Sequence, residues 1–333
     1  MKIFKLLPIF MFIISCTKVK TINKKEHSFN SYPEKLIILQ VPGLSEEHLA
    51  YLRFQKPLMK EATWPENFTC FGKMWRFNLH STRPKVEDSL LSQITGYSGS
   101  EQKCEKYNKN TVWSVLSKFN YQTAIVERGS SEFIENALKC NDKYFKDSAT
   151  FISTARAKGE NIFHHQRSGS YENSKVYYDD SCSKGECFSK SSEVFFHAWN
   201  SLTNRPKKLM IYRDHGLLNA IKANDREKFY SSLVDLNKLV GDIQKQIQSK
   251  NPDSLVVVTS TSPRHINWPK DSRSWKRLNL AKSSRDGELL SPVWANGAMS
   301  ENFCGMFSEF EIFERVFWRP KKSRFPLVDA LGF

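Results

Sequence analysis

Residues 251–265, NPDSLVVVTSTSPRH, decide the fold of this chain. Residues 255–258 (LVVV) at its centre are an unbroken run of apolar, mostly β-branched side chains. Such a run is typical of a strand that is buried on both faces of a parallel sheet. In open α/β sheets the functional groups lie just beyond the carboxyl ends of the strands. That position holds residues 260–265 (STSPRH), which therefore form the first candidate region for a site.

A long amphipathic helix is predicted before this strand, over residues 225–249. Asn224 and Glu227 are spaced as an N-cap and its capping partner, and Asn251-Pro252 ends the helix. Six apolar residues follow one another at intervals of three or four and so share one face of the helix. They are Phe229, Leu233, Leu236, Val240, Ile243 and Ile247.

The rest of the chain alternates between predicted strands and predicted helices. Strands are expected at 36–41, 121–126 and 208–212, and helices at 45–60, 86–94, 111–119, 131–138, 192–202 and 309–318. Asp286-Gly287 is predicted to be a turn between two extended segments. The alternation predicts a three-layer α/β/α sandwich with a mostly parallel central sheet, in which the four strands lie side by side.

The first residues have the pattern of an export signal. Lys2 and Lys5 precede a short apolar run at 6–14, and residues 13–16 (IISC) resemble a bacterial lipobox. By that resemblance, 1–15 are removed and Cys16 carries lipid, with an ordinary signal peptide or a short anchor as alternatives. Thr17 favours the outer membrane. We therefore expect an exported lipoprotein, anchored on the periplasmic or outer-membrane face.

The expected domain organisation is simple. Residues 16–33 form a lipidated tether, and 34–333 form a single domain with a polar insertion near 141–190. The insertion is expected to be irregular. With 40% hydrophobic and 26% charged residues, the chain is globular in composition and can bury a large core.

The chain is basic, with a formal net charge of +15, or +13 once Lys2 and Lys5 are removed. A basic protein at a membrane meets anionic partners, such as phospholipid headgroups or polyanionic glycans. A general bias of the source towards lysine is the alternative explanation. No compact basic run is interleaved with aromatic residues, so nucleic acid is not an expected partner.

Six of the seven cysteines remain after Cys16 is set aside. Export makes disulfides possible, and six cysteines allow up to three. Cys182 and Cys187 lie close together in sequence and could pair locally. There is no CxxC motif, which argues against a zinc ribbon or a thioredoxin-like site.

The order of segments resembles the alkaline phosphatase-like superfamily, which includes sulfatases and nucleotide phosphodiesterases. The likeness runs from about Lys35 to Trp318. Residues 36–44 (LIILQVPGL) resemble the family's first strand and turn, 89–96 (SLLSQITG) the helix after the nucleophile, and 111–124 the next helix and strand. Residues 225–260 resemble the core helix and strand, and 291–297 (SPVWANG) the segment before the last helix. The resemblance implies the same three-layer fold.

The resemblance also implies a chemistry that most of the matching positions lack. The family uses two divalent metals and an alkoxide nucleophile. Pro42 stands where the family has a metal-binding Asp, and Thr261-Ser262 where it has Asp-His; no histidine follows His265. Counting back from Gly96 places the nucleophile at Val86. Ser81 and Thr82 are the nearby hydroxyl groups that could serve as the nucleophile instead. No metal cofactor is expected, and a divalent metal such as zinc is the alternative.

Several residues remain as candidates for a site. Asp214 and His215 partly match the family's mid-chain Asp and His, and a rearranged metal site could combine them with His265 and His197. Each could equally be structural, as a loop cap or a solvated side chain; His164-His165 is expected to be solvated. The cationic candidates for binding an anionic ligand are Arg83, Lys85, Arg213, Arg264 and His265.

Three functions are compatible with these observations. The first is an envelope lipoprotein that has lost metal catalysis. It would bind an anionic ligand or a partner in the cleft that corresponds to the active site of the family. The second is an active hydrolase or phosphotransferase on phosphate or sulfate esters with a non-standard site. The third is a structural envelope lipoprotein. Whether the protein is an enzyme therefore stays open from the sequence.

Overall fold

The structure is a computed structural model. It describes residues 33–55, 63–77, 81–98, 104, 107, 110–130, 132–140, 149–153, 163–164, 176–178, 190–202, 205–268, 270–286 and 289–317. Its framework is a large sheet with the strand order β12-β2-β11-β8-β1-β7-β3-β4-β6-β5. The bounds are β1 Lys35–Gln40, β2 Cys70–Trp75, β3 Tyr121–Arg128, β4 Thr150–Ser153, β5 Phe163–His164, β6 Val176–Tyr178, β7 Lys207–Asp214, β8 Ser254–Thr259, β11 Leu290–Gly297 and β12 Gly305–Ser308.

The centre of the sheet is made by the four strands that the sequence predicts. The strands β8, β1, β7 and β3 are neighbours in that order, and each adjacent pair is parallel. Ile38 of β1, for example, is level with Ile211 of β7 and Val257 of β8. Their side chains are almost all buried, as expected for strands covered on both faces. The predicted arrangement is confirmed.

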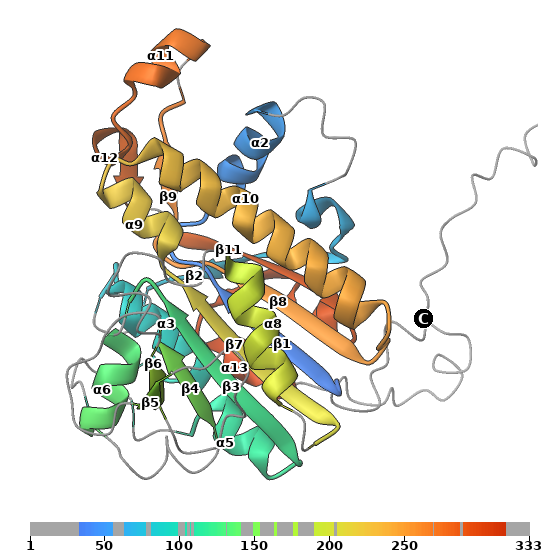
Figure 1. Ribbon diagram of the computed structural model, residues 1–333. Coiled ribbons are helices and arrows are strands. Elements are labelled where there is room, and N and C mark those ends of the chain that lie inside the picture. The colour runs from blue at the N-terminus through green and yellow to red at the C-terminus, as the bar shows by residue number, and fades with distance from the viewer. Residues whose placement is uncertain are drawn as a thin grey trace, which may run out of the picture.

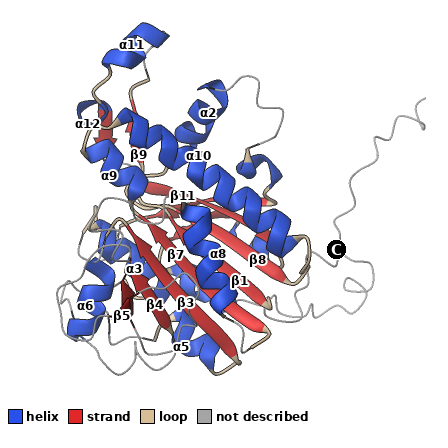
Figure 2. Ribbon diagram, viewed as in Figure 1, coloured by secondary structure: helices blue, strands red, loops and turns tan. Residues whose placement is uncertain are grey.

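Helices cover both faces of this sheet. Their bounds are α2 Glu46–Gln55, α3 Val86–Thr95, α5 Val112–Ser117, α6 Glu132–Cys140, α8 Ser191–Ser201, α9 Gly216–Lys222, α10 Arg226–Ile243 and α13 Glu311–Phe317. In Figure 1, α8 and α10 cross in front of the sheet, whereas α3 and α13 lie behind it. Figure 2 shows the same layers by secondary structure. The fold is thus the predicted three-layer α/β/α sandwich.

Alternate residues of each central strand feed two separate cores. On β1, Ile37 and Leu39 pack with residues of α8, α9 and α10, whereas Leu36 and Ile38 pack with residues of α3, α5, α6 and α13. This alternation follows from the two-residue period of a strand. Burial on both faces fixes the register of the strands, since a slip by one residue would exchange the two faces.

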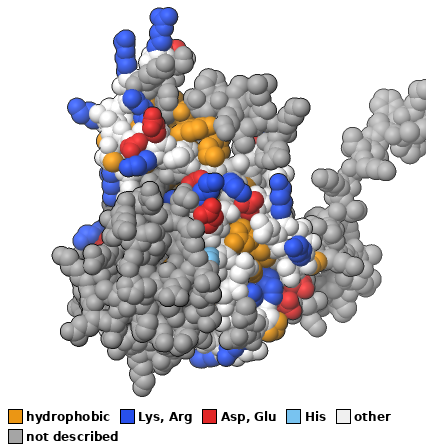
Figure 3. Space-filling model, in the orientation of Figure 1, with side chains coloured by type: hydrophobic (Ala, Val, Ile, Leu, Met, Phe, Trp, Pro, Cys, Tyr) orange, Lys and Arg blue, Asp and Glu red, His pale blue; other side chains and the backbone are white. Residues whose placement is uncertain are grey.

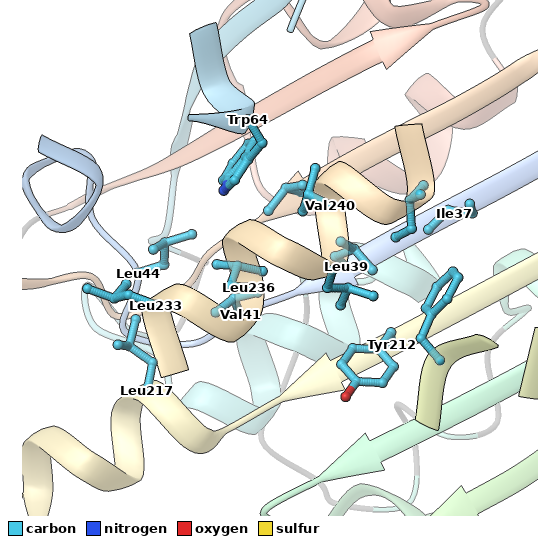
Figure 4. Close-up of a cluster of buried hydrophobic side chains, with 14 of the residues drawn as sticks. Ile37, Leu39, Val41, Leu44, Trp64, Tyr212, Leu217, Leu233, Leu236 and Val240 are labelled. Carbon is cyan, nitrogen blue, oxygen red and sulfur yellow. The ribbon is translucent and has the colours of Figure 1, made fainter. Parts of the chain in front are cut away.

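The helix α10 packs as its apolar spacing predicts. Figure 4 shows Leu233, Leu236 and Val240 of α10 next to side chains of β1. All six residues of the predicted stripe are buried. A π-helical turn, η3 (Gln244–Gln248), extends the helix and carries the last of them, Ile247. The predicted packing face is therefore confirmed.

The N-cap of α10 differs from the prediction. Asp225 is the N-cap, and its side chain accepts a hydrogen bond from the backbone N–H of Lys228 at 3.0 Å. Asn224 has a left-handed φ of 56° and accepts from the backbone N–H of Leu280 at 2.7 Å. Asn224 is thus used to fix a distant segment and not to cap the helix.

The antiparallel strand β11 joins the parallel core to the last two strands. It pairs antiparallel with both β8 and β2, and β12 then pairs parallel with β2. A Cβ at Gly72 of β2 would lie 2.4 Å from the carbonyl oxygen of Phe303, so only glycine fits there. A disulfide joins Cys70 to Cys304 beside this contact, and a second joins Cys104 to Cys140. Cys182 and Cys187 lie outside the described residues.

A small two-stranded sheet stands beyond the carboxyl ends of the central strands. It pairs β9 (Arg264–Ile266) with β10 (Ser284–Asp286), and α11 (Ser272–Arg277) and α12 (Leu280–Ser283) lie between them in sequence. In Figure 1, α11 stands above the left end of α10, and α12 lies beside that end. Asp286 ends β10, in agreement with the predicted turn, although Gly287 lies outside the described residues.

The sequence predicts that the segment 141–190 is irregular, but part of it forms strands. The strands β4, β5 and β6 come from it, and all four residues of β4 are buried. Most of the remainder of this segment, the predicted signal sequence 1–15, Cys16 and most of the predicted tether lie outside the described residues. Within the described part of the chain, no helix has the length and apolar character needed to cross a membrane.

Candidate functional site

The candidate site residues that follow or end the central strands lie at one edge of the sheet. Pro42 follows β1 and Thr261 follows β8, and the two turns are joined by a hydrogen bond of 2.8 Å from the N–H of Gly43 to the carbonyl oxygen of Thr261. Arg213 lies near the end of β7, and Glu127 near the end of β3. Because these strands are parallel neighbours, their carboxyl ends meet at this edge.

A buried ionic cluster lies at this edge. The Arg213 side chain is fully buried, and its Nη2 lies 3.0 Å from both carboxylate oxygens of Glu87 on α3. Its Nη1 lies 3.7 Å from Oε1 of Glu127, and its guanidinium stacks 4.1 Å from the ring centre of Phe133. We call Glu87, Glu127, Arg213 and His215 the Arg213 cluster.

The other two members of the Arg213 cluster are held by backbone contacts. Glu127 accepts hydrogen bonds from the N–H groups of Phe133 and Ile134 in the first turn of α6, at 3.3 and 3.2 Å. His215 is the N-cap residue of α9, and its own N–H donates to the carbonyl oxygen of Arg128 at 2.9 Å. The His215 Nε2 lies 3.9 Å from Oε1 of Glu127. Secondary structure therefore positions each side chain.

Burial sets the protonation states of the Arg213 cluster. Burial raises the pKa of Glu127 to about 8, although Arg213 acts in the opposite direction. Burial also raises the pKa of Glu87, and it lowers the pKa of His215 to about 3. Arg213 cannot lose its proton in a protein, and its donors approach both oxygens of Glu87, so Glu87 is the ionised partner. At neutral pH, Glu127 is then mostly protonated and His215 is neutral.

A second buried network contains Ser262 and lies near Thr261, the two residues at which the resemblance places metal ligands of the family. Arg76 donates from Nη2 to Oγ of Ser262 at 2.6 Å, and both side chains are buried. Glu309 is also buried; burial raises its pKa to about 7, although the nearby charge of Arg76 acts in the opposite direction. Thr261 and Ser262 are both buried as well, so neither side chain is presented to solvent.

The rearranged metal site that the sequence left open, from Asp214, His215, His265 and His197, is not assembled among the described residues. Asp214 pairs with Arg128 at 3.0 Å and accepts from the N–H of Gly216 at 2.8 Å. His265, on β9, pairs through Nδ1 with Glu47 at 2.9 Å. In the described part of the chain, one group of side chains could together hold a metal ion. It consists of Glu87, Glu127 and His215, whose ligand-type atoms lie within 4.8 Å of one another. Of the four expected residues, only His215 belongs to it.

The cationic candidates are not all at the surface. Arg83 and Lys85 are exposed just before α3, and Arg264 and His265 are partly exposed on β9. Arg213 is fully buried and forked on Glu87, so its expected contact with an external ligand is wrong. The hydroxyl candidates Ser81 and Thr82 lie in the same turn as Arg83. The backbone N–H of Arg83 donates a hydrogen bond to Oγ of Ser81 at 3.1 Å.

Sequence reasoning missed Glu87 and Glu127. Counting back from Gly96 reaches Val86, which is directly followed by Glu87. Glu127 directly follows the apolar run 124–126 (AIV) near the end of β3, at the edge where functional groups gather. Both signals were present in the sequence, but neither residue matches a family ligand in sequence.

The donor atoms of the Arg213 cluster suit a divalent metal, but the cluster as a whole does not. Two carboxylates and a neutral imidazole are ligands of the type that zinc takes. The guanidinium of Arg213, however, already contacts both carboxylates. A divalent ion would meet a fixed positive charge within a few ångströms in a buried place, where such repulsion is little screened. The residues therefore do not fit a metal while Arg213 is in place.

A pocket lies at the other end of α3. Its volume is about 400 Å³, and its lining includes Thr95, Gly96, Asn110, Phe313 and Phe317. None of the candidate site residues lines this pocket.

Comparisons with solved structures agree with the fold. The chain superposes on the alkaline phosphatase of the Antarctic bacterium TAB5 with a TM-score of 0.64 and 15% identity, over 86% of this chain and 98% of that one. For the Thermus thermophilus alkaline phosphatase the TM-score is 0.67 at 9% identity, over 88% and 92%. For a cold-active alkaline phosphatase of Shewanella sp. it is 0.65 at 13% identity, over 86% and 100%. No protein-family model and no curated protein matches the sequence. At these identities the likeness shows an alkaline phosphatase-like fold.

Proposed function

We propose that this protein is an exported lipoprotein with an alkaline phosphatase-like fold that has lost metal catalysis and binds an anionic ligand or an envelope partner. The observation that carries the proposal is the buried fork between Arg213 and Glu87 at the carboxyl edge of the sheet. Two-metal catalysis needs free carboxylates and imidazoles that hold the ions and activate a nucleophile. Here the carboxylates are engaged by a permanent cation.

The second part of the proposal rests on the exposed cations near α3. Arg83 and Lys85 are exposed directly before the first turn of this ten-residue helix, where the helix dipole favours an anion. The net charge of the mature chain attracts anionic partners in general. Figure 3 shows Lys and Arg side chains spread over the described surface of one face, several of them beside Asp or Glu. We therefore place the anionic ligand at Arg83 and Lys85, with Arg264 and His265 as further contacts.

Export and anchoring are supported by the sequence and by two disulfides. The run 13–16 resembles a lipobox, and the disulfides Cys70–Cys304 and Cys104–Cys140 need an oxidising compartment to persist. Mass spectrometry of the N-terminus of the membrane-extracted protein tests the anchor. We expect a diacylated or triacylated Cys16 as the first residue. A protein that retains residues 1–15 and a free Cys16 thiol contradicts the lipoprotein assignment.

One observation favours the alternative of an active hydrolase with a non-standard site. Glu87, Glu127 and His215 bring three ligand-type atoms within 4.8 Å of one another. If Arg213 could move aside, this trio would be the metal site of that enzyme. The experiment below is chosen to separate the two functions.

The test is metal content and hydrolysis, measured on the purified wild-type protein without its signal sequence. We expect less than one zinc, manganese or magnesium ion per chain after dialysis. We also expect no chelator-sensitive hydrolysis of phosphate monoesters, phosphate diesters or sulfate esters. One tightly bound metal per chain, with a chelator-sensitive hydrolysis that Glu127→Gln removes, establishes the alternative function.

Ligand binding is tested with inorganic phosphate and sulfate by calorimetry. Arg83→Ala and Lys85→Ala are expected to weaken binding, whereas Lys250→Ala, a change at an exposed cation far along the chain, is the matched control. Equal binding by all of these variants contradicts the position of the ligand.

A further inference from the structure

The Arg213 cluster contains the parts of a metal site other than the metal. Glu87, Glu127 and His215 are all buried, and each offers one ligand-type atom within 4.8 Å of the other two. They come from α3, from β3 and from the start of α9, so three separate elements converge on one point. Packing of these elements against the sheet holds the three side chains in place.

The imidazole of His215 is the second sign of a site. His215 is only 8% exposed, and among the described residues its Nε2 has no hydrogen-bond partner. A buried polar atom without a partner is uncommon, because it has lost its hydrogen bond to water. The Nε2 lies on the Glu127 side of the ring, at 3.9 Å from a carboxylate oxygen. A neutral imidazole with an unused nitrogen is the form in which histidine binds a metal.

The guanidinium of Arg213 supplies the positive charge that these ligands need. It lies 3.0 Å from Glu87 and 3.7 Å from Glu127. A cation that already contacts both carboxylates takes the place of the metal ion that these carboxylates would otherwise hold.

We propose that Glu87, Glu127 and His215 form a divalent-metal site that the guanidinium of Arg213 keeps closed. The inference shares its location with the proposed function, because both concern the Arg213 cluster. It adds a statement that the proposed function does not contain: the ligands are competent, and one residue alone prevents them from binding metal.

The test removes the guanidinium and measures metal binding directly. Arg213→Met keeps an unbranched apolar stem without the charge. We expect this variant to bind one Co²⁺ per chain, with visible ligand-field absorption of a low-coordinate site, and to bind Zn²⁺ in competition with it. Wild type is expected to show neither. Absence of Co²⁺ binding by folded Arg213→Met overturns the proposal.

Two controls separate the loss of this charge from a general loosening of the protein. Arg213→Lys retains a cation at the same position and is expected to remain closed to metal. Arg76→Met removes another buried arginine, which has Glu309 near it and, among the described residues, no such trio of ligands, and this variant is expected to gain no site. Arg213→Met combined with Glu127→Gln or with His215→Phe is expected to lose the gained Co²⁺ site. A site that survives both second changes contradicts the assigned ligands.

Stability gives a second measurement if Arg213→Met is difficult to purify. Arg213→Gln keeps hydrogen-bond donors for Glu87 without the charge. The melting temperature of either variant, or its refolded yield, is expected to rise with added Zn²⁺, because a ligand that binds the folded state stabilises it. If Zn²⁺ stabilises neither variant more than it stabilises wild type, the proposal fails. Metal-free wild type together with metal-free variants overturns this inference alone, whereas wild type that carries metal overturns the proposed function as well.

Discussion

The guanidinium of Arg213 lies across both carboxylate oxygens of Glu87, at 3.0 Å from each, and no part of the arginine is exposed to solvent. The two residues are 126 positions apart in the chain and come from β7 and α3. This pair connects the central sheet to the helix behind it by charge. Removal of either partner would leave a buried charge without compensation, which is far more costly than loss of a surface pair.

Glu87→Gln is therefore expected to lower the free energy of unfolding by about 3–5 kcal/mol, the typical cost of breaking a buried ion pair. Urea denaturation followed by circular dichroism measures the change. The control is Lys238→Gln, which removes an exposed pair with Asp242 one turn away on α10. The control is expected to cost at most about 1 kcal/mol, as surface pairs do. Similar losses in the two variants would contradict a special role for the buried pair.

The raised pKa of Glu127, to about 8, predicts a specific pH dependence of stability. Between the ordinary pKa of a glutamate, about 4.3, and this value, the folded state binds more protons than the unfolded state. The stability that this adds is complete below the unfolded pKa and is lost as the pH rises through 8. Burial raises the pKa of Glu309 to about 7, so Glu309 acts in the same direction.

Glu127→Gln should remove the contribution of Glu127 and leave that of Glu309. The free energy of unfolding of wild type, minus that of Glu127→Gln, is expected to fall steadily from about pH 5 to about pH 9. Urea titrations of both proteins across this range measure the difference. Parallel pH profiles for the two proteins would mean that Glu127 ionises normally. His215, with a pKa lowered to about 3, acts at the other end, since stability is lost as the pH falls below its unfolded value.

Leu233→Asp is expected to prevent folding, because it places an unpaired charge in the core between α10 and the sheet. Circular dichroism and gel filtration report the loss of a compact structure. Ser231→Asp is the matched control, since Ser231 is exposed on the same helix. It is expected to change stability by no more than about 0.5 kcal/mol. A folded Leu233→Asp protein would contradict the packing of α10.

The two disulfides are expected to differ in their contribution to stability. Cys70–Cys304 spans 234 positions and Cys104–Cys140 spans 36. In the chain-entropy model, the longer loop stabilises by roughly 1–2 kcal/mol more. Denaturation of the paired variants Cys70→Ala/Cys304→Ala and Cys104→Ala/Cys140→Ala measures both contributions. Peptide mapping without reductant checks the connectivity, and any other pairing would contradict the structure.

The framework of the fold could be predicted because it depends on local patterns. The apolar run at 255–258 and the stripe of α10 each need only a short window of sequence, and both are confirmed. The predicted N-cap of α10, Asn224, was wrong by one residue, because Asp225 caps the helix. Asn224 instead accepts a hydrogen bond from the backbone N–H of Leu280, a contact that no local pattern reveals.

The candidate site could be predicted only in part because it depends on contacts between distant segments. From the sequence, Arg213 is expected to be a cation available to an anionic ligand. The order β8-β1-β7-β3 and the position of α3 bring Glu127 and Glu87 to it instead. A charge in a sequence does not show its partner, and the partner decides whether the charge binds a ligand or closes a site.

The central place of β1 also determines when the protein can fold. This strand is the first to be synthesised, yet its two neighbours are β7 and β8, and β8 ends at Thr259. Until Asp214 has left the ribosome, the apolar β1 has neither neighbour, and it lacks β8 until Thr259 has left as well. Such distant pairing makes folding slow and leaves hydrophobic surface open to aggregation in the meantime. The central sheet therefore cannot be completed until most of the chain has been synthesised.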